Sequence, residues 1–331
     1  MRRSLTAATL ALALASHPAG ATRTAWVANA LANSVTVLDA RTAATIATVQ
    51  VGCEPRDVAA LPDGTRLYVA NMCSDDPDSL VDTVSVIDAA TRTVVDTIDV
   101  GTAPRALAVS PDGARLYVAN YGIKQFLDPS MPGTVSVIDT ATDEVVATLA
   151  LGFAPFDVAV AVDGDTLYVT GPAGVALVDP GTAAILDTIP GPRSSIAVDP
   201  SGRTLHVTDA WDGTLSRVDL VARTVTSTVP IGVAPQMIAI DPHGARVWVT
   251  SAGASPNQPP DEVTIVRARS ETVARRADGG DAPVGVALAS RRRLLVSNFY
   301  TGDVLVLDAA SGRRRGAGHA GPGAGAIAVT P

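Results

Sequence analysis

Residues 62–71 read PDGTRLYVAN and residues 111–120 read PDGARLYVAN, so ten positions return forty-nine residues later with one change. A turn-and-strand unit that recurs along a chain is the signature of a repeat architecture. Further turns of this kind are anchored at Pro62, Pro111, Val162, Pro200, Pro242, Ser290 and Pro331, at spacings of 38 to 51 residues. The chain is therefore expected to repeat one supersecondary unit seven times.

Each repeat is predicted to hold four short β-strands. In the repeat that begins at Pro104, these are residues 104–110, 115–119, 134–139 and 145–149, which are rich in β-branched residues and alternate in polarity. Asp112 and Gly113 form the first turn, because Asp bonds its own backbone and Gly accepts a left-handed conformation. Four antiparallel strands of this length cannot bury their faces alone, so neighbouring sheets must stack, as propeller blades do.

Counting third strands gives the number of blades. Seven such segments are found, at residues 34–39, 83–88, 134–139, 175–179, 214–219, 262–267 and 303–308. Residues 25–51 lack a first strand, and residues 325–329 form a first strand with nothing after it. We therefore predict an all-β, seven-bladed propeller of four-stranded antiparallel blades over residues 22–331, with the N- and C-terminal strands sharing one blade and closing the ring.

Residues 1–21 read as a signal peptide. Arg2 and Arg3 precede an apolar run over residues 5–15, and the small residues Ala19 and Ala21 flank Gly20 as at a signal-peptidase site. The run is too short to span a bilayer stably. Export to the periplasm or the extracellular space is predicted, with no transmembrane segment in the mature chain. The alternative is an apolar N-terminal helix that stays attached.

The charge balance is acidic, with 33 Asp and Glu against 25 Lys and Arg. An electrostatic footprint for nucleic acid is therefore not evident, although net charge does not exclude a basic patch on one face. We expect a monomer.

The repeated residues resemble a known family. Tyr-Val-Ala-Asn at 68–71 and 117–120, Tyr-Val-Thr at 168–170 and the Val-Ser-Val-Ile-Asp strands are similar to YVTN-type β-propeller repeats of exported bacterial and archaeal surface proteins. The resemblance covers essentially the whole mature chain and implies the propeller fold. It extends more distantly to haem d1-binding propellers, which typically have eight blades. Function is expected where the repeats differ.

Connections between second and third strands, and from blade to blade, open on the same rim of a propeller. Three are long, at residues 72–82, 121–133 and 252–261, so this rim is the predicted recognition surface. Trp211, Phe299 and Tyr300 fall in its connections and could anchor a partner protein. Alternatively, the long loops are insertions without a role, and the aromatic side chains fill gaps between blades.

Two features of the loop at residues 72–82 suggest cross-linking or metal binding. Asp75, Asp76, Asp78 and Asp82 could hold Ca²⁺, which accepts irregular oxygen ligands, although the loop lacks the glycine and glutamate of an EF-hand. The alternative is a set of solvated acids. Cys53 and Cys73, the two cysteines of the chain, are predicted to form a disulfide in an oxidising compartment. A thiolate site for haem or metal lacks the usual Cys-x-x-Cys-His spacing.

The start of each inner strand should lie near the mouth of a central channel. Arg56, Arg105, Phe156 and Gln236 take this position, and Arg193 is displaced from it by one residue. Converging guanidiniums could clamp a small anionic ligand bidentately. The competing interpretation is that Asp57 and Asp157 pair with these arginines within the scaffold.

No catalytic constellation is evident, and no cofactor is predicted. His206, His243 and His319 fall in unlike positions of their repeats and are not expected to converge. We therefore predict an exported propeller that binds a ligand or a protein through its loop-rich rim. The alternative is a periplasmic enzyme or cofactor-binding accessory, lyase-like or related to haem d1 propellers, that uses the channel mouth.

Overall fold

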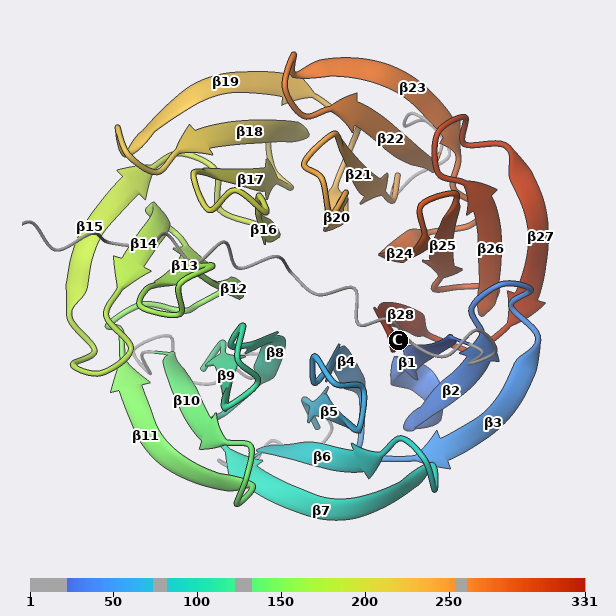
Figure 1. Ribbon diagram of the computed structural model, residues 1–331, viewed down its shortest axis with the longest axis horizontal. Coiled ribbons are helices and arrows are strands. Elements are labelled where there is room, and N and C mark those ends of the chain that lie inside the picture. Colours follow the sequence, from blue (N-terminus) through green and yellow to red (C-terminus); the bar gives the residue numbers. More distant parts are fainter. Residues whose placement is uncertain (1–22, 74–81, 123–132, 254–260, 331) are drawn as a thin grey trace, which may run out of the picture.

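The computed structural model describes residues 23–73, 82–122, 133–253 and 261–330. Its strands form seven antiparallel sheets of four strands each. Figure 1 shows these sheets as blades around a closed ring. The predicted seven-bladed propeller is confirmed.

The blades are numbered along the chain, and each contributes strands in order from the axis outward. The inner strands of blades 1 to 7 are β28 (Ala324–Val329), β4 (Pro55–Ala60), β8 (Pro104–Val109), β12 (Asp157–Val160), β16 (Ile196–Val198), β20 (Pro235–Ile240) and β24 (Pro283–Ser290). The second strands are β1 (Thr24–Asn29), β5 (Arg66–Asn71), β9 (Arg115–Asn120), β13 (Leu167–Gly171), β17 (Thr204–Asp209), β21 (Arg246–Ser251) and β25 (Arg293–Asn298).

The third strands are β2 (Ser34–Asp39), β6 (Asp82–Asp88), β10 (Thr134–Asp139), β14 (Gly174–Val178), β18 (Thr214–Asp219), β22 (Glu262–Arg267) and β26 (Asp303–Asp308). The outer strands are β3 (Thr45–Gln50), β7 (Thr93–Val100), β11 (Glu144–Ala150), β15 (Ile185–Pro190), β19 (Thr224–Pro230), β23 (Thr272–Asp278) and β27 (Arg314–His319). A short 3-10 helix, η1 (Ala30–Ala32), connects β1 to β2. We call the rim with the second-to-third-strand and blade-to-blade connections the loop rim, and the opposite one the turn rim.

The ring closes within blade 1. The antiparallel register pairs Ala25 with Val329 and Val27 with Ile327, so β28 provides the inner strand of the blade that β1, β2 and β3 begin. In Figure 1, β28 lies directly beside β1. The predicted closure by the terminal strands is confirmed.

The hydrophobic core is divided among the contacts between blades. Seven clusters of buried side chains each join two neighbouring blades. Trp26 of blade 1, for example, packs in one cluster with Leu67 of blade 2. Every blade therefore depends on both neighbours for burial, as the repeat argument predicts.

The repeated stretch is scaffold. Gly64 and Gly113 adopt φ of 72° and 75° in the first turn of their blades. The carboxylate of Asp63 accepts a hydrogen bond of 2.9 Å from the Thr65 backbone N–H. Leu67 and Leu116 are fully buried. The second strand of each blade is thus fixed by a tight turn at one end and by burial along its length.

The asparagine that ends this stretch has a role that sequence analysis did not assign. The amide of Asn71 donates to the hydroxyls of Thr83 and Ser85 at 3.1 and 2.9 Å, so it ties the second strand to the third. Asn120 makes the same pair of bonds in blade 3. A Cβ on Gly52 would lie 2.6 Å from the Asn71 side chain, so the connection into blade 2 needs glycine there.

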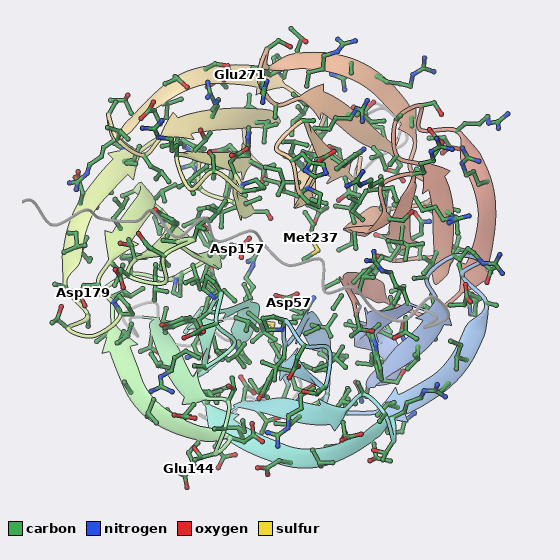
Figure 2. The ribbon with its side chains drawn as sticks, in the orientation of Figure 1. Asp57, Glu144, Asp157, Asp179, Met237 and Glu271 are labelled. Atoms are coloured by element: carbon green, nitrogen blue, oxygen red, sulfur yellow. A yellow bond between two sulfur atoms is a disulfide. The ribbon has the colours of Figure 1, made fainter. Side chains whose placement is uncertain are left out.

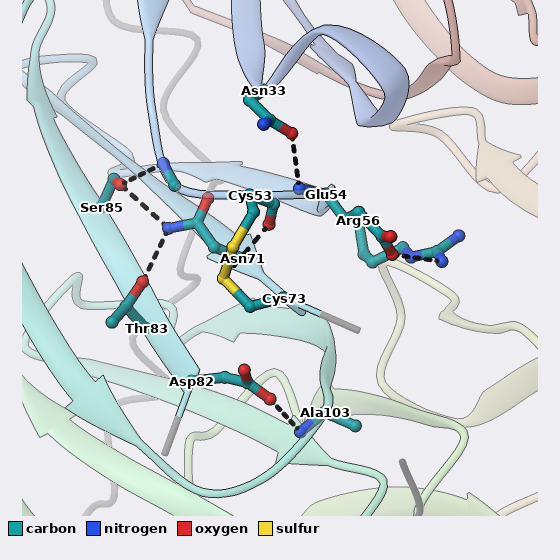
Figure 3. The surroundings of a disulfide bond; sticks show 11 residues. Asn33, Cys53, Glu54, Arg56, Asn71, Cys73, Asp82, Thr83, Ser85 and Ala103 are labelled. Carbon is teal, nitrogen blue, oxygen red and sulfur yellow. Dashed lines mark hydrogen bonds and ion pairs between the residues drawn. A yellow bond between two sulfur atoms is a disulfide. The ribbon is translucent and has the colours of Figure 1, made fainter. Parts of the chain in front are cut away.

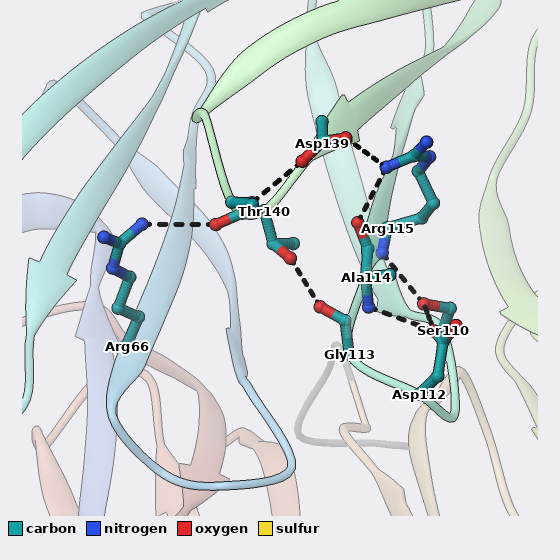
Figure 4. A network of polar contacts seen from close by, with 9 residues as sticks. Arg66, Ser110, Asp112, Gly113, Ala114, Arg115, Asp139 and Thr140 are labelled. Atoms are coloured by element: carbon teal, nitrogen blue, oxygen red, sulfur yellow. Dashed lines mark hydrogen bonds and ion pairs between the residues drawn. The ribbon is translucent and has the colours of Figure 1, made fainter.

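Polar contacts also join blades on the turn rim. Figure 4 shows Arg66 of blade 2 donating to the carbonyl of Thr140 in blade 3 at 3.2 Å. Thr140 in turn donates its hydroxyl hydrogen to the Gly113 carbonyl, and Arg115 pairs with Asp139. Asp143 accepts bonds from both Arg66 and Tyr68 at 2.6 and 2.8 Å. These contacts fix the relative position of blades 2 and 3.

Candidate functional site

The predicted disulfide is present. Cys53, in the connection into blade 2, is bonded to Cys73, which follows the second strand of that blade. Figure 3 shows it between Asn71 and the backbone of Glu54, whose N–H donates to Asn33 at 2.9 Å. The bond joins two connections of the loop rim.

The predicted calcium ligands are only partly placed. Asp82 is buried, and its carboxylate accepts the Ala103 N–H at 2.7 Å, so it links blade 2 to the connection into blade 3. Asp75, Asp76 and Asp78 lie outside the described residues. Within the described ranges, no group of three or more metal-ligating side chains is spaced to hold an ion. Calcium binding by this loop stays a prediction.

Five side chains of blades 3, 4 and 5 form a cluster on the loop rim. The ring centroids of Tyr121 and Phe156 lie 5.7 Å apart, and those of Phe156 and Trp211 also lie 5.7 Å apart. Arg105 lies 5.8 and 5.7 Å from the centroids of Tyr121 and Phe156, and Arg193 lies 4.7 Å from that of Trp211. We call these five residues the rim cluster. Its guanidiniums are within the range of cation–π attraction.

The two guanidiniums differ in their polar partners. Arg193 Nε lies 3.3 Å from a carboxylate oxygen of Asp209. Arg105 is exposed, and its guanidinium makes no hydrogen bond or ion pair with any residue that the structure describes. The protein packed around the Arg105 guanidinium removes part of its hydration and so lowers its pKa. The nearby Asp157 carboxylate acts in the opposite direction. Arg105 therefore holds its position through aromatic contact and keeps its N–H donors available.

Two other predicted channel residues are already engaged. Arg56 forms an ion pair with Glu54 at 3.1 Å, and Gln236 donates its side-chain amide hydrogen to the Ala234 carbonyl at 2.9 Å. The structure thus brings Arg105, Phe156 and Arg193 together. The Gln236 side chain instead bonds to the backbone of the connection that precedes it. Tyr121, which completes the cluster, was missed because it was assigned only to a long loop.

A hollow adjoins the rim cluster. It has a volume of about 470 Å³, lies between blades 4 and 5, and is lined in part by Arg193, Asp209, Asp212 and Thr214. A small molecule held against Trp211 could therefore extend between these blades.

Among the described residues, Asp57 and Asp157 form no ion pair with the arginines, although Asp157 and Arg105 attract each other electrostatically. Each carboxylate accepts two backbone N–H bonds, including one from the inner strand of the next blade: Leu107 donates to Asp57 at 2.8 Å, and Ile196 donates to Asp157 at 3.0 Å. In Figure 2 both lie at the inner edge of the ring, as does Met237. They join neighbouring blades at the axis.

Burial raises the pKa of both carboxyl groups. The pKa of Asp57 rises to about 7, with a further contribution from the nearby Asp157 carboxylate. The pKa of Asp157 rises to about 6, although backbone hydrogen bonds and Arg105 act against the increase. Two groups that exchange protons near neutral pH therefore lie beside the rim cluster.

The raised pKa of Asp57 predicts a pH-dependent stability. The folded protein keeps this proton up to about pH 7, whereas the unfolded chain releases it near the ordinary value of 3.8. Between about pH 4 and pH 7, unfolding therefore releases a proton from Asp57, and the stability of the fold decreases progressively as pH rises. We expect thermal melts to show Asp57→Asn gaining stability relative to wild type across this window.

Asp308→Asn serves as the control for this prediction. A hydrogen bond from Arg315 holds the pKa of Asp308 below its usual range. The melting difference between this variant and wild type should therefore change only below about pH 4. A constant difference for Asp57→Asn across the neutral window would contradict the raised pKa.

The rim aromatics form two groups. Trp211, 64% exposed, belongs to the rim cluster. Phe299 and Tyr300 form an edge-to-face pair 5.6 Å apart on blade 7, where Tyr300 is 75% exposed. Phe153 instead packs against the core between blades 3 and 4. Trp211 and Tyr300 are thus exposed on the rim, whereas Phe153 fills a gap between blades.

His206 and His243 fall in unlike positions of neighbouring blades, and both border one hollow. The hollow has a volume of about 350 Å³ and lies between blades 5 and 6 on the turn rim. Burial lowers the pKa of His206 to about 4, so its imidazole is neutral at physiological pH. The turn of blade 6 that carries His243 packs against blade 5, since a Cβ on Gly244 would lie 2.5 Å from the Asp199 carboxylate. His319 lies apart and contacts Asp303 at 3.3 Å.

The molecule is thus a seven-bladed β-propeller with a cationic and aromatic cluster on its loop rim. No family model matches the chain. It is 24% identical over 195 residues to antigen Lp49 of Leptospira interrogans, covering 52% of this chain and 42% of the antigen. The chain therefore spans less than half the length of this curated relative.

Two solved structures are similar in fold. The periplasmic gluconolactonase of Pseudomonas aeruginosa superposes with a TM-score of 0.75 at 15% identity, covering 94% of this chain and 99% of the other. Dihydro-haem d1 dehydrogenase NirN, in complex with DHE, gives 0.66 at 18% identity, covering 95% and 77%. Identities this low show a shared fold alone.

Proposed function

We propose that this chain is an exported binding module whose rim cluster holds a small ligand with an anionic group and a flat apolar part. The observation that carries the proposal is the exposed guanidinium of Arg105, which lies against two aromatic rings and makes no hydrogen bond or ion pair among the described residues. Such a guanidinium can bind a carboxylate or phosphate bidentately, while the largely exposed indole of Trp211 offers apolar surface for a flat group.

Export is part of the same proposal. The disulfide supports it, because such bonds persist in oxidising compartments. No helix in the described ranges is long and apolar enough to cross a membrane. The predicted signal peptide lies outside the described residues, and membership of the YVTN-type repeat family stays a prediction supported by the repeated Tyr-Val-Ala-Asn segments.

Trp211 provides a direct test of ligand binding. The chain has three tryptophans, and Trp26 and Trp248 are 1% exposed, so a surface ligand should change mainly the fluorescence of Trp211. We expect saturable binding of benzoate, used as a probe, and weaker binding of acetate. Arg105→Gln should weaken benzoate binding by about tenfold or more, because a charge-assisted hydrogen bond is lost.

The matched control is Arg41→Gln, which alters an exposed arginine on the turn rim of blade 1. Equal loss of affinity in both variants, or no saturable change with benzoate, would contradict the proposed site. Native and denaturing mass spectra of protein purified from its own host would then show whether any non-covalent ligand is bound.

An enzyme or cofactor-binding accessory is the second candidate. It is favoured by the raised pKa of Asp57 and Asp157, since a carboxyl group that titrates near pH 7 suits general acid–base catalysis. None of the three described histidines belongs to the rim cluster, so a haem-type centre there would lack imidazole ligands. Visible absorbance in the purified protein that persists in Arg105→Gln would favour this candidate.

A further inference from the structure

The arginines of this acidic chain are concentrated in blades 6 and 7. Residues 262–319 contain ten arginines against six acidic residues, whereas the whole chain has a formal net charge of −8. Figure 2 shows nitrogen-tipped side chains projecting outward beside β23, β26 and β27. This side of the propeller therefore has the opposite charge from the chain as a whole.

Four of these arginines line one hollow. It has a volume of about 540 Å³ and lies between the outer strand of blade 6 and the turn from β26 to β27; its arginines are Arg275, Arg276, Arg313 and Arg315. The turn sits tightly against β23, because a Cβ on Gly312 would lie 2.4 Å from the Ala277 Cβ. Gly312 also has φ of 67°, which favours glycine. Through this close approach, Arg313 of blade 7 and Arg275 of blade 6 line the same hollow.

Two of the guanidiniums are anchored and two are available. Arg276 pairs with Glu262 and donates to the Pro230 carbonyl at 3.1 Å, and Arg315 pairs with Asp308. Arg275 and Arg313 are exposed, and their guanidiniums make no hydrogen bond or ion pair with any residue in the described ranges. No carboxylate in the described ranges forms an ion pair with either guanidinium, so an anion held in the hollow would find two cations free to bind it.

We propose that this hollow binds a ligand that carries two or more phosphate or sulfate groups. The guanidinium fork matches the oxygens of both groups bidentately, and arginines on two sides of a hollow can contact two such groups at once. The site is separate from the rim cluster, which blades 3, 4 and 5 build, and does not depend on the function proposed for that cluster.

The surroundings favour recognition of the oxyanions themselves. No aromatic residue lines the hollow, so bases of a nucleic acid would find no stacking surface. Among the described residues, the large hydrophobic side chains that are exposed do not lie on β23, β26 or β27, so insertion into a lipid surface has no apolar anchor there.

Calorimetric titration with tripolyphosphate, and separately with dextran sulfate, tests the proposal and distinguishes a phosphate chain from a sulfated glycan. We expect wild type to bind at least one of them, and added salt to weaken binding because the contacts are ionic. Arg275→Gln/Arg313→Gln should weaken that binding by about tenfold or more. Its melting temperature without ligand should equal that of wild type, since both side chains are exposed.

The matched control is Arg41→Gln/Arg92→Gln, which removes two exposed arginines from the corresponding turns of blades 1 and 2. This variant should bind as wild type does. Equal weakening in both double variants would show diffuse charge attraction and overturn the site. Failure of wild type to bind either probe would also overturn it. Vesicles that contain phosphatidylglycerol are titrated in parallel, and binding to these vesicles alone would overturn the site as well.

Discussion

A variant that ends at residue 323 should lose about 10 °C or more in melting temperature, or fail to fold, because it lacks β28. Ala324 and Ala326 are buried in the cores that blade 1 shares with its neighbours, and the backbone of Val27 pairs with Ile327. Deletion would also leave β1 as an open sheet edge at the axis, which invites aggregation. Circular dichroism melts of both proteins give the measurement.

Strand complementation provides the control for this deletion. A synthetic peptide of residues 324–330 should restore much of the lost stability by adding back the inner strand. The same peptide with Ala326→Asp should not, because position 326 is 1% exposed and cannot accept a charge. A truncated protein that melts as full length does would show that blade 1 needs no closing strand.

Replacing both cysteines should lower the free energy of unfolding by about 3 kcal/mol, the magnitude expected for releasing a loop of this length. Cys53 and Cys73 are separated by 20 residues, and their bond restricts the unfolded chain over that span. Urea titration of Cys53→Ser/Cys73→Ser against wild type measures the difference.

Reductant distinguishes the bond from the substitutions themselves. Treatment with dithiothreitol should lower the stability of wild type to about that of the double variant and leave the variant unchanged. Titratable thiol in wild type denatured without reductant would refute the cross-link in the purified protein.

Most of the fold was predictable because its signals are local. The Asp-Gly turns, the alternation of residues such as those at 134–139, and the unmatched terminal strands each specify structure within one repeat. Arg105 and Phe156 could be located for the same reason, since both follow a proline at the start of an inner strand. The disulfide was predictable because both cysteines fall beside the loop rim of one blade.

The features that were missed arise between blades. Tyr121 and Phe156 occupy unlike positions in neighbouring repeats, yet their rings lie 5.7 Å apart. Arg275 lies within an outer strand and Arg313 within the turn of the next blade, and they line one hollow where Gly312 packs closely against Ala277. A repeat period aligns equivalent positions, whereas contact between unlike positions depends on how each blade is tilted against the next.

The pairing of β1 with β28 also constrains when the protein can fold. Residue 25 pairs with residue 329, so the first blade cannot be completed until almost all of the chain has been synthesised. Contacts of such long sequence separation form slowly, because the loop between them must close before the pairing is gained. Until then, the earlier blades form an open arc. A chain that crosses a membrane in extended form would therefore finish folding only on the far side, after its last strand has emerged.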